Sequence, residues 1–121
     1  MSIVGINKVK KIFLVFFVSA CTDPKEEVAE PESQEATVSV AQMELGLEVF
    51  NNKAQCGMCH TLQAAGSEGQ IGINLDQLKP LMSQVIMVVT NGNGVMPAFE
   101  GMLSSEEIEA VSYFVSTSTN Q

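Results

Sequence analysis

Apolar residues recur at helical spacing in three stretches beyond residue 40. The spacing predicts one helix over about 41–52, a second from Pro80 to a stop at Asn91-Gly92, and a third from Ser104 to about 118. The predicted apolar faces are Met43, Gly46, Leu47 and Phe50; Met82, Val85, Ile86 and Val89; and Ile108, Val111, Phe114 and Val115.

Local signals support two of these boundaries. Pro80 suits the first turn of the second helix. Ser104 and Glu107 form the S-x-x-E pattern of a capping box, which predicts the start of the C-terminal helix. The β-branched residues of the second stretch would also suit a strand, so periodicity alone leaves that choice open. No alternating strand pattern stands out, and 65–72 is rich in glycine, so we expect an all-α domain with long loops.

The first 20 residues are typical of an export signal peptide. Lys8, Lys10 and Lys11 form its basic region, and Ile12–Val18 forms a short apolar core. A transmembrane helix is the alternative, but it needs about 20 apolar residues, far more than this run offers.

The sequence Val-Ser-Ala-Cys at residues 18–21 resembles the lipobox of bacterial lipoproteins. The resemblance implies cleavage between Ala20 and Cys21 and acylation of the Cys21 sulfur. Ordinary cleavage after Ala20, with an incidental cysteine, is the alternative. Acyl chains would anchor the protein stably, because about 0.8 kcal/mol per buried methylene accumulates along each chain.

Residues 21–40 predict an acidic, disordered tether between this anchor and a domain at 41–121. The segment combines several carboxylates with Pro24 and Pro31 and has almost no large apolar side chain. Such a composition cannot offset the entropy of its own ordering.

The chain is acidic, with a formal net charge of -8 at pH 7 and no arginine. Nucleic acid is excluded as a partner, because phosphates require a basic surface. A redox partner with a basic docking patch is the expected counterpart.

Residues 56–60 read Cys-Gly-Met-Cys-His, which is the C-x-x-C-H signature of covalent c-type haem attachment. The two thiols, Cys56 and Cys59, would lie on one side of a helical turn and add to the haem vinyl groups. His60 would then supply an imidazole nitrogen to the iron. We therefore expect one covalently bound haem c.

Two other sites use similar residues. A thioredoxin-like C-x-x-C pair belongs to a βαβ unit, which this chain does not predict. A zinc site needs four ligands, whereas His60 is the only histidine and adjoins Cys59.

The sixth ligand of the iron is expected to be a methionine, because no second histidine exists. Met58 lies inside the attachment turn, and three others lie at positions that suit helix cores, which is the commoner role of methionine. Met96 lies in a loop flanked by Gly92, Gly94 and Pro97, and such a loop can pass close to a porphyrin. Met96 is the predicted ligand, while Met102 and an open site remain alternatives. The three methionines at helix positions are Met43, Met82 and Met87.

Over about 41–118 the chain resembles class I bacterial monohaem cytochromes c, in their lipoprotein form. The segments 89–92 and 96–99 are similar to the methionine loop of photosynthetic carriers that substitute for plastocyanin. The resemblance implies the small cytochrome c fold, in which the N- and C-terminal helices cross at Gly46 and Phe50 of the first and Tyr113 or Phe114 of the second.

The family also places a Gly-Pro-Asn-Leu segment after the haem motif, and Gly72-Ile73-Asn74-Leu75 stands in its place here. The resemblance implies that the main-chain carbonyl of Ile73 accepts a hydrogen bond from His60 and that Leu75 packs on the haem. Ile73 and Leu75 are therefore the expected haem-pocket residues.

The expected function is one-electron transport between redox complexes by a protein that is not itself an enzyme. The expected location is the outer face of the bacterial cytoplasmic membrane or the periplasm, with a lipid anchor. Two alternatives remain: a haem subunit of a larger dehydrogenase or oxidase, and a gas-binding haem sensor with an open iron site.

Overall fold

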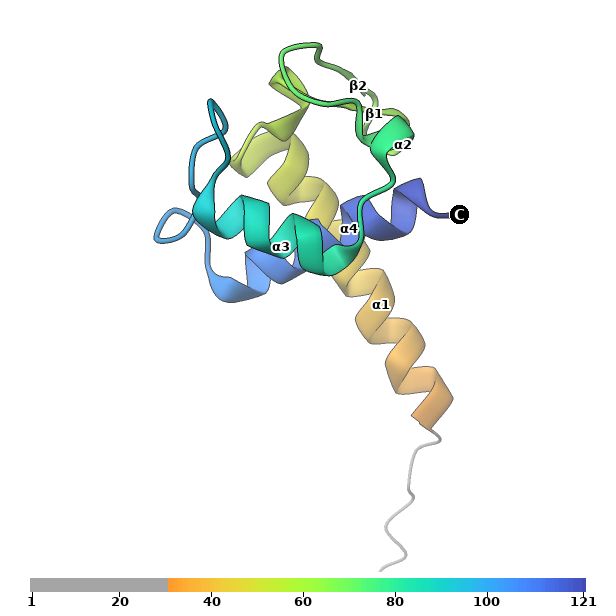
Figure 1. Ribbon diagram of the computed structural model, residues 1–121. Coiled ribbons are helices and arrows are strands. Elements are labelled where there is room, and N and C mark those ends of the chain that lie inside the picture. The colour runs from red at the N-terminus through yellow and green to blue at the C-terminus, as the bar shows by residue number, and fades with distance from the viewer. Residues whose placement is uncertain (1–30) are drawn as a thin grey trace, which may run out of the picture.

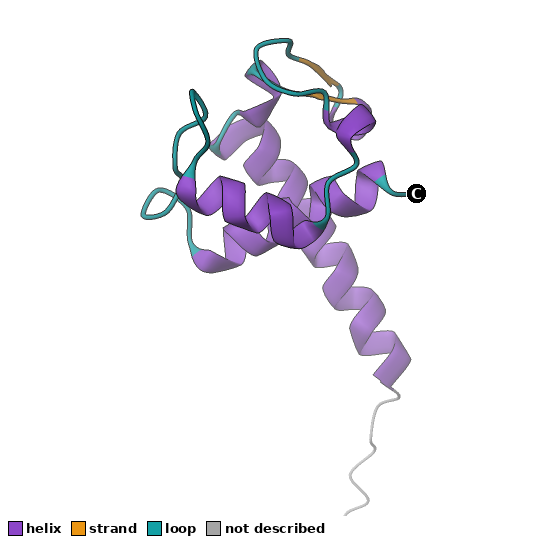
Figure 2. Cartoon of the chain, in the orientation of Figure 1, coloured by secondary structure: helices purple, strands orange, loops and turns teal. Residues whose placement is uncertain are grey.

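The computed structural model describes residues 31–121. Helices make up most of this part of the chain, and a small hairpin lies at one end of the helix group (Figures 1 and 2). The helices are α1 (Pro31–Glu48), α2 (Leu75–Leu78), α3 (Met82–Asn91) and α4 (Ser105–Thr119). The structure thus confirms the all-α class, and the short turns between the helices carry the chemistry.

Helix α1 begins at Pro31, ten residues before the predicted start. The prediction of a disordered tether through residue 40 is therefore wrong for its second half. A proline suits a helix start because its fixed backbone angle matches the helix and its missing N–H would have no partner in the first turn. This end of α1 projects from the body of the molecule (Figure 1). The predicted signal peptide, Cys21 and the first part of the tether lie outside the described residues.

The crossing of α1 over α4 organises the core. A side chain at Gly46 would meet the main-chain oxygen of Ala110 and would lie 2.5 Å from Cβ of Phe114. One turn further, the rings of Phe50 and Phe114 meet edge to face, with centroids 6.0 Å apart. The absence of a side chain at Gly46 lets the two backbones approach closely enough for this contact. Phe114, rather than Tyr113, supplies the aromatic ring that was expected here.

The apolar face of α1 differs from the prediction at one position. Leu47 is 36 % exposed, whereas Val49 is 1 % exposed and belongs to the core with Phe50. The π-helical turn η1 (Val49–Lys53) follows α1 directly and changes the helical period there. Val49 lies three residues after Gly46 and next to Phe50, so it shares their face of the helix and is buried where Leu47 was predicted.

Helix α3 resolves the choice between helix and strand in favour of a helix. Its N-cap is Leu81, so Pro80 lies just before the helix rather than in its first turn. The main-chain N–H of Leu81 donates to Oε1 of Gln84 at 3.0 Å. The helix ends as predicted at Asn91, with Gly92 as its C-cap. Val85, Ile86 and Val89 pack against the core. Met82 is half-buried, but Met87 is 59 % exposed, so the prediction of a core position for Met87 is wrong.

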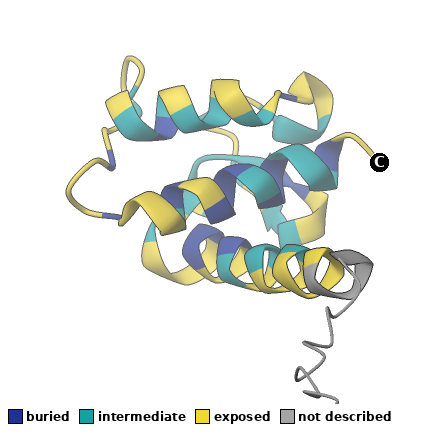
Figure 3. Ribbon diagram, turned by 90° about the horizontal axis from the view of Figure 1, so that it is seen from below, coloured by how far each residue is buried: buried dark blue, intermediate teal, exposed yellow. Residues whose placement is uncertain are grey.

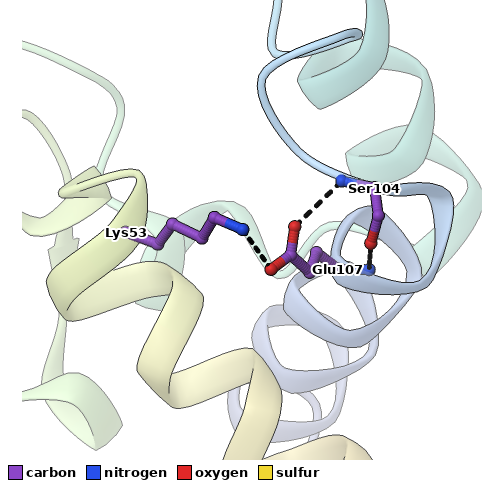
Figure 4. Close-up of polar contacts among 3 residues, drawn as sticks. All are labelled: Lys53, Ser104 and Glu107. Atoms are coloured by element: carbon purple, nitrogen blue, oxygen red, sulfur yellow. Dashed lines mark hydrogen bonds and ion pairs between the residues drawn. The ribbon is translucent and has the colours of Figure 1, made fainter.

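Helix α4 begins with the predicted capping box. The main-chain N–H of Glu107 donates to Oγ of Ser104 at 3.2 Å, and the N–H of Ser104 donates to Oε2 of Glu107 at 2.9 Å (Figure 4). Lys53, at the end of η1, forms an ion pair with the other carboxylate oxygen of Glu107. This pair joins the N-terminal end of α4 to the segment that precedes Cys56.

The predicted apolar face of α4 is buried throughout. Figure 3 shows buried residues along the middle of the helix group and exposed ones on its outside. The buried apolar residues of α4 are Ile108, Ala110, Val111, Phe114 and Val115.

A short hairpin and a one-turn helix, both between residues 61 and 78, were not predicted. Strands β1 (Thr61–Leu62) and β2 (Ser67–Glu68) pair antiparallel, with Leu62 opposite Ser67. Helix α2 is a single turn capped by Asn74, whose Oδ1 accepts from the N–H of Gln77 at 3.1 Å. These elements are too short to produce a periodic pattern. In the part of the chain that the structure describes, no helix has the length and apolarity that crossing a membrane requires.

Substituting Gly46→Ala is expected to destabilise the protein by about 1–3 kcal/mol, because the new methyl group has no space against the α4 backbone. Chemical denaturation of the holoprotein measures this change. Glu44→Ala, at an exposed position two residues earlier, is the control and should change the free energy of unfolding by no more than about 0.5 kcal/mol. Equal stability of Gly46→Ala and the wild type would contradict the close crossing.

Glu107 predicts a pH dependence of stability. The hydrogen bond from Lys53, followed by the one from the Ser104 N–H, lowers the pKa of Glu107 below its usual 4.5. The stabilisation of the folded state by ionised Glu107 is therefore fully present above pH 4.5, and it is lost as the pH falls through the folded-state pKa. The difference in free energy of unfolding between the wild type and Glu107→Gln should shrink on acidification. Glu109→Gln, on the same helix, is the control and should show no such convergence.

Candidate functional site

The cysteine motif forms a tight turn. Cys56–Met58 is a 3₁₀ helix, η2, preceded by Gln55 in the left-handed conformation with φ of 52°. The N–H groups of Cys59 and His60 both donate to the carbonyl oxygen of Cys56, at 3.1 and 2.9 Å. Both thiols are free and half-buried. The turn thus brings the two sulfur-bearing residues and the histidine into one compact unit.

Burial dominates the ionisation of Cys56. It raises the pKa of the Cys56 thiol to about 11, and the nearby Cys59 adds to this rise. Cys56 also packs against the core that α1 and α4 form. In the chain before any group is attached to its sulfur, the Cys56 thiol is accordingly protonated at neutral pH.

His60 is oriented by the expected main-chain partner. Its Nδ1 lies 2.8 Å from the carbonyl oxygen of Ile73. A carbonyl can only accept, so Nδ1 carries the proton and donates. In the neutral ring, Nε2 then keeps its lone pair and is free to bind a metal ion.

Gly72 lies directly against the imidazole. A Cβ at this position would lie 2.5 Å from Cε1 of His60 and 2.7 Å from its Nδ1. The N–H of Gly72 also donates to the carbonyl of Cys59 at 2.7 Å. The residue before Ile73 therefore has to be glycine for the ring to reach the Ile73 carbonyl.

The two expected pocket residues differ in their surroundings. The side chain of Ile73 is 60 % exposed, so its described contribution is the carbonyl alone. Leu75 begins α2 and packs against the core. Their contact with a haem remains a prediction.

Met96 is held by its own loop. Its N–H donates to the carbonyl of Asn93, and its carbonyl accepts from the N–H of Asn93, both at 3.0 Å. The loop is tied to α3 where the N–H of Phe99 donates to the carbonyl of Val89 at 2.9 Å. Met96 is half-buried and packs against the core, whereas Met102 is 62 % exposed.

The hydrogen bonds therefore join Cys56, Cys59, His60 and Ile73 into one unit, while Met96 is placed by a separate set of bonds. Two thiols on one turn, an imidazole with a free Nε2 and a half-buried thioether fit the donor set of a covalently attached haem. No cluster of three His, Cys, Asp or Glu side chains suited to a metal ion occurs among residues 31–121.

Sequence reasoning missed two polar side chains around this unit. Ser67 contacts the main chain of His60 and Leu62, and Oδ2 of Asp76 accepts from the N–H of Gln63 at 2.9 Å. The Gly-Ser-Glu-Gly sequence at 66–69 is typical of any polar turn, so it gave no signal for Ser67. Asn74 before an apolar residue is a recognisable helix N-cap and could have located α2.

A family model described as "Cytochrome C oxidase, cbb3-type, subunit III" matches residues 41–115. Over 74 residues the chain is 35 % identical to cytochrome c6 of Leptolyngbya boryana, a match covering 58 % of this chain and 85 % of that relative. It is 34 % identical over 91 residues to the chloroplastic cytochrome c6 of Chlamydomonas reinhardtii, covering 66 % of this chain and 57 % of the relative.

Among solved structures, the crystal structure of the c-type cytochrome SorU from Sinorhizobium meliloti is similar. It superposes with a TM-score of 0.64 at 46 % sequence identity, and the match covers 68 % of this chain and 95 % of that chain.

Proposed function

Because this chain belongs to the cytochrome c family and carries one covalently attached haem c, we propose that it is a membrane-anchored one-electron carrier with a His60- and Met96-ligated iron. The observation that carries the ligand proposal is the hydrogen bond between Nδ1 of His60 and the Ile73 carbonyl. It leaves Nε2 as the only ring nitrogen able to bind iron, and it strengthens that nitrogen as a donor.

Cys56 and Cys59 are the proposed attachment residues. Cys56 begins the turn η2 and Cys59 is its C-cap, and His60 follows without an intervening residue. The burial of Cys56 against the core would keep the attached group beside the apolar interior rather than in solvent.

Met96 is the proposed second axial ligand. It is half-buried and packed against the core, and its paired hydrogen bonds with Asn93 restrict the loop. Met102 is largely exposed, which makes it the weaker candidate. A thioether is a soft ligand that raises the reduction potential of a haem iron.

When bound, the haem supplies a reversible one-electron couple. The chain holds His60 through Ile73 and Met96 through Asn93, so both proposed ligands can stay in place in both oxidation states. The sequence contains no arginine and no second histidine that could assist peroxide cleavage. We therefore propose that the protein passes electrons and catalyses no chemical conversion itself.

Redox partners are proposed to dock through complementary charge. The described domain is acidic, with Lys53 paired to Glu107, and a basic patch on the partner would speed encounter. Met58 in the attachment turn is 70 % exposed and Val95, beside Met96, is 91 % exposed. These apolar side chains are suited to a brief contact that excludes water.

A fixed haem subunit is the second candidate. The matching family model is described as a subunit of a cbb3-type oxidase, and that observation favours a permanent place in a larger complex. Purification in mild detergent separates the two: a stoichiometric large partner supports the subunit, and an isolated monomer supports the carrier.

The anchor and location are proposed from the sequence. Cys21 would be acylated after removal of residues 1–20, which would place the domain on the outer face of the cytoplasmic membrane or in the periplasm.

Met96→Ala is expected to abolish the weak far-red band that a sulfur-to-iron bond produces in the oxidised protein, while the haem stays covalently attached. The reason is the loss of the thioether ligand. Optical spectra of oxidised and reduced protein, made with a haem-maturation system, measure this. Met102→Ala is the control and should keep the band. A wild type that binds carbon monoxide freely would contradict Met96 ligation and favour the gas-binding alternative.

Cys21→Ser is expected to move the protein from the membrane fraction to the soluble fraction of cells, because no acyl chain can then be attached through sulfur. Fractionation followed by haem staining measures the distribution, and Cys59→Ser, which keeps the anchor, should remain in the membrane fraction as detected by an antibody. Membrane association of Cys21→Ser equal to that of the wild type would contradict the lipid anchor.

A further inference from the structure

We propose that Ser67 is a positioning residue for the haem ligand His60, an inference that rests on the proposed ligation of the iron by His60. Ser67 lies in β2, the second strand of the hairpin, whereas the cysteine motif comes before the first strand. Its hydroxyl nevertheless contacts the main chain of His60 itself.

The hydroxyl bridges the two residues on either side of Thr61. Oγ of Ser67 donates to the carbonyl oxygen of His60 at 3.0 Å and accepts from the N–H of Leu62 at 3.1 Å. The carbonyl of Leu62, at 3.3 Å, is a second and longer acceptor. Leu62 is 0 % exposed, so water cannot replace Ser67 as the acceptor for its N–H.

Packing prevents Ser67 from moving away. Its Cβ is 2.7 Å from the position that a Cβ on Gly57 would occupy, so β2 lies directly against the attachment turn. Behind it, Oγ1 of Thr61 donates to the carbonyl of Gly69 at 2.8 Å. Hydrogen bonds from both strands, one from Thr61 and one from Ser67, therefore hold the hairpin in place around the Ser67 hydroxyl.

His60 is therefore held at two points. The Ile73 carbonyl fixes the ring through Nδ1, and Ser67 fixes the peptide group on the C-terminal side of the same residue. Ser67 acts on the ring only through the main chain. Removing its hydroxyl leaves the carbonyl of His60 free to rotate, which should lengthen the bond from Nδ1–H to Ile73.

The effect on the iron has a definite sign. A weaker hydrogen bond from Nδ1–H makes the imidazole a poorer electron donor. A poorer donor stabilises the ferric iron less, so the reduction potential should rise.

The test compares Ser67→Ala with Ser104→Ala in the holoprotein. Both changes remove a serine hydroxyl that caps main-chain groups, but Ser104 is the N-cap of α4 and only Ser67 bonds to His60. The first readout is the equilibrium constant for reduction against a common mediator. The second is hydrogen exchange of Nδ1–H in protein labelled with ¹⁵N-histidine, where His60 gives the only signal because the chain has one histidine.

Ser67→Ala should favour reduction at least about threefold, which is about 28 mV at 59 mV per tenfold change, and should speed Nδ1–H exchange about tenfold. Ser104→Ala should change neither, although it lowers stability. Wild-type values in Ser67→Ala, or equal changes in both variants, would overturn the positioning role while leaving the carrier proposal intact. A wild type without histidine-ligated haem would overturn both.

Ser67→Thr restores the hydroxyl and should return both readouts to wild-type values. Ser67→Thr also tests the proposal if Ser67→Ala yields no protein with attached haem. Normal haem attachment and potential in Ser67→Thr would then support the role of the hydroxyl, and loss of attachment in both variants would overturn it.

Discussion

The close crossing of α1 and α4 at Gly46 is the constraint on which the rest of the molecule depends. It sets the distance between the two longest helices and brings Phe50 against Phe114. The π-helical turn η1 follows at once, so the direction in which the chain leaves α1 is determined by this contact. Lys53 comes next and forms an ion pair with Glu107 of α4, and Cys56, three residues later, packs against the core. The attachment turn is therefore joined to both crossing helices through the short segment that follows Phe50.

Beyond that crossing, residues 56–78 are ordered chiefly by main-chain hydrogen bonds. The segment has few fully buried side chains, and Ile71, Ile73 and Leu78 are exposed. Its order comes instead from bonds such as Gly72 N–H to the Cys59 carbonyl and Ser67 Oγ to the His60 carbonyl. A segment held in this way keeps its backbone in place while leaving apolar side chains available to a cofactor or a partner. That combination suits a site that must hold a cofactor rigidly and still leave apolar side chains exposed for contact with a partner protein.

The sequence predicted those parts of the protein whose signal is periodic or chemical. Helices α3 and α4 follow from regular apolar spacing and from the Ser104–Glu107 capping box, and the haem motif follows from three residues at fixed offsets. The hairpin could not be predicted, because strands of two residues have no period to detect, whereas α2, a single turn, offered only the N-cap residue Asn74 as a signal. Val49 rather than Leu47 lies in the core, because both are at helical spacing from neighbours of the apolar face and apolar spacing alone does not choose between them. Ser67 was missed for a different reason. Its partners are main-chain atoms, which every residue has, so no particular side chain in the sequence indicates the contact.

The helical start at Pro31 changes how an anchor at Cys21 would act on the domain. A coil through residue 40 would let the domain turn freely above a membrane. Residues 31–40 instead continue α1, whose far end is packed against α4 through Gly46. Ten helical residues rise about 15 Å, so they form a spacer whose direction is tied to the core of the domain. This helix takes the place of half of the coil predicted between Cys21 and the domain, so the connection to a membrane-bound partner is stiffer at its domain end than the sequence indicated. It also limits the orientations in which the attachment turn can meet that partner.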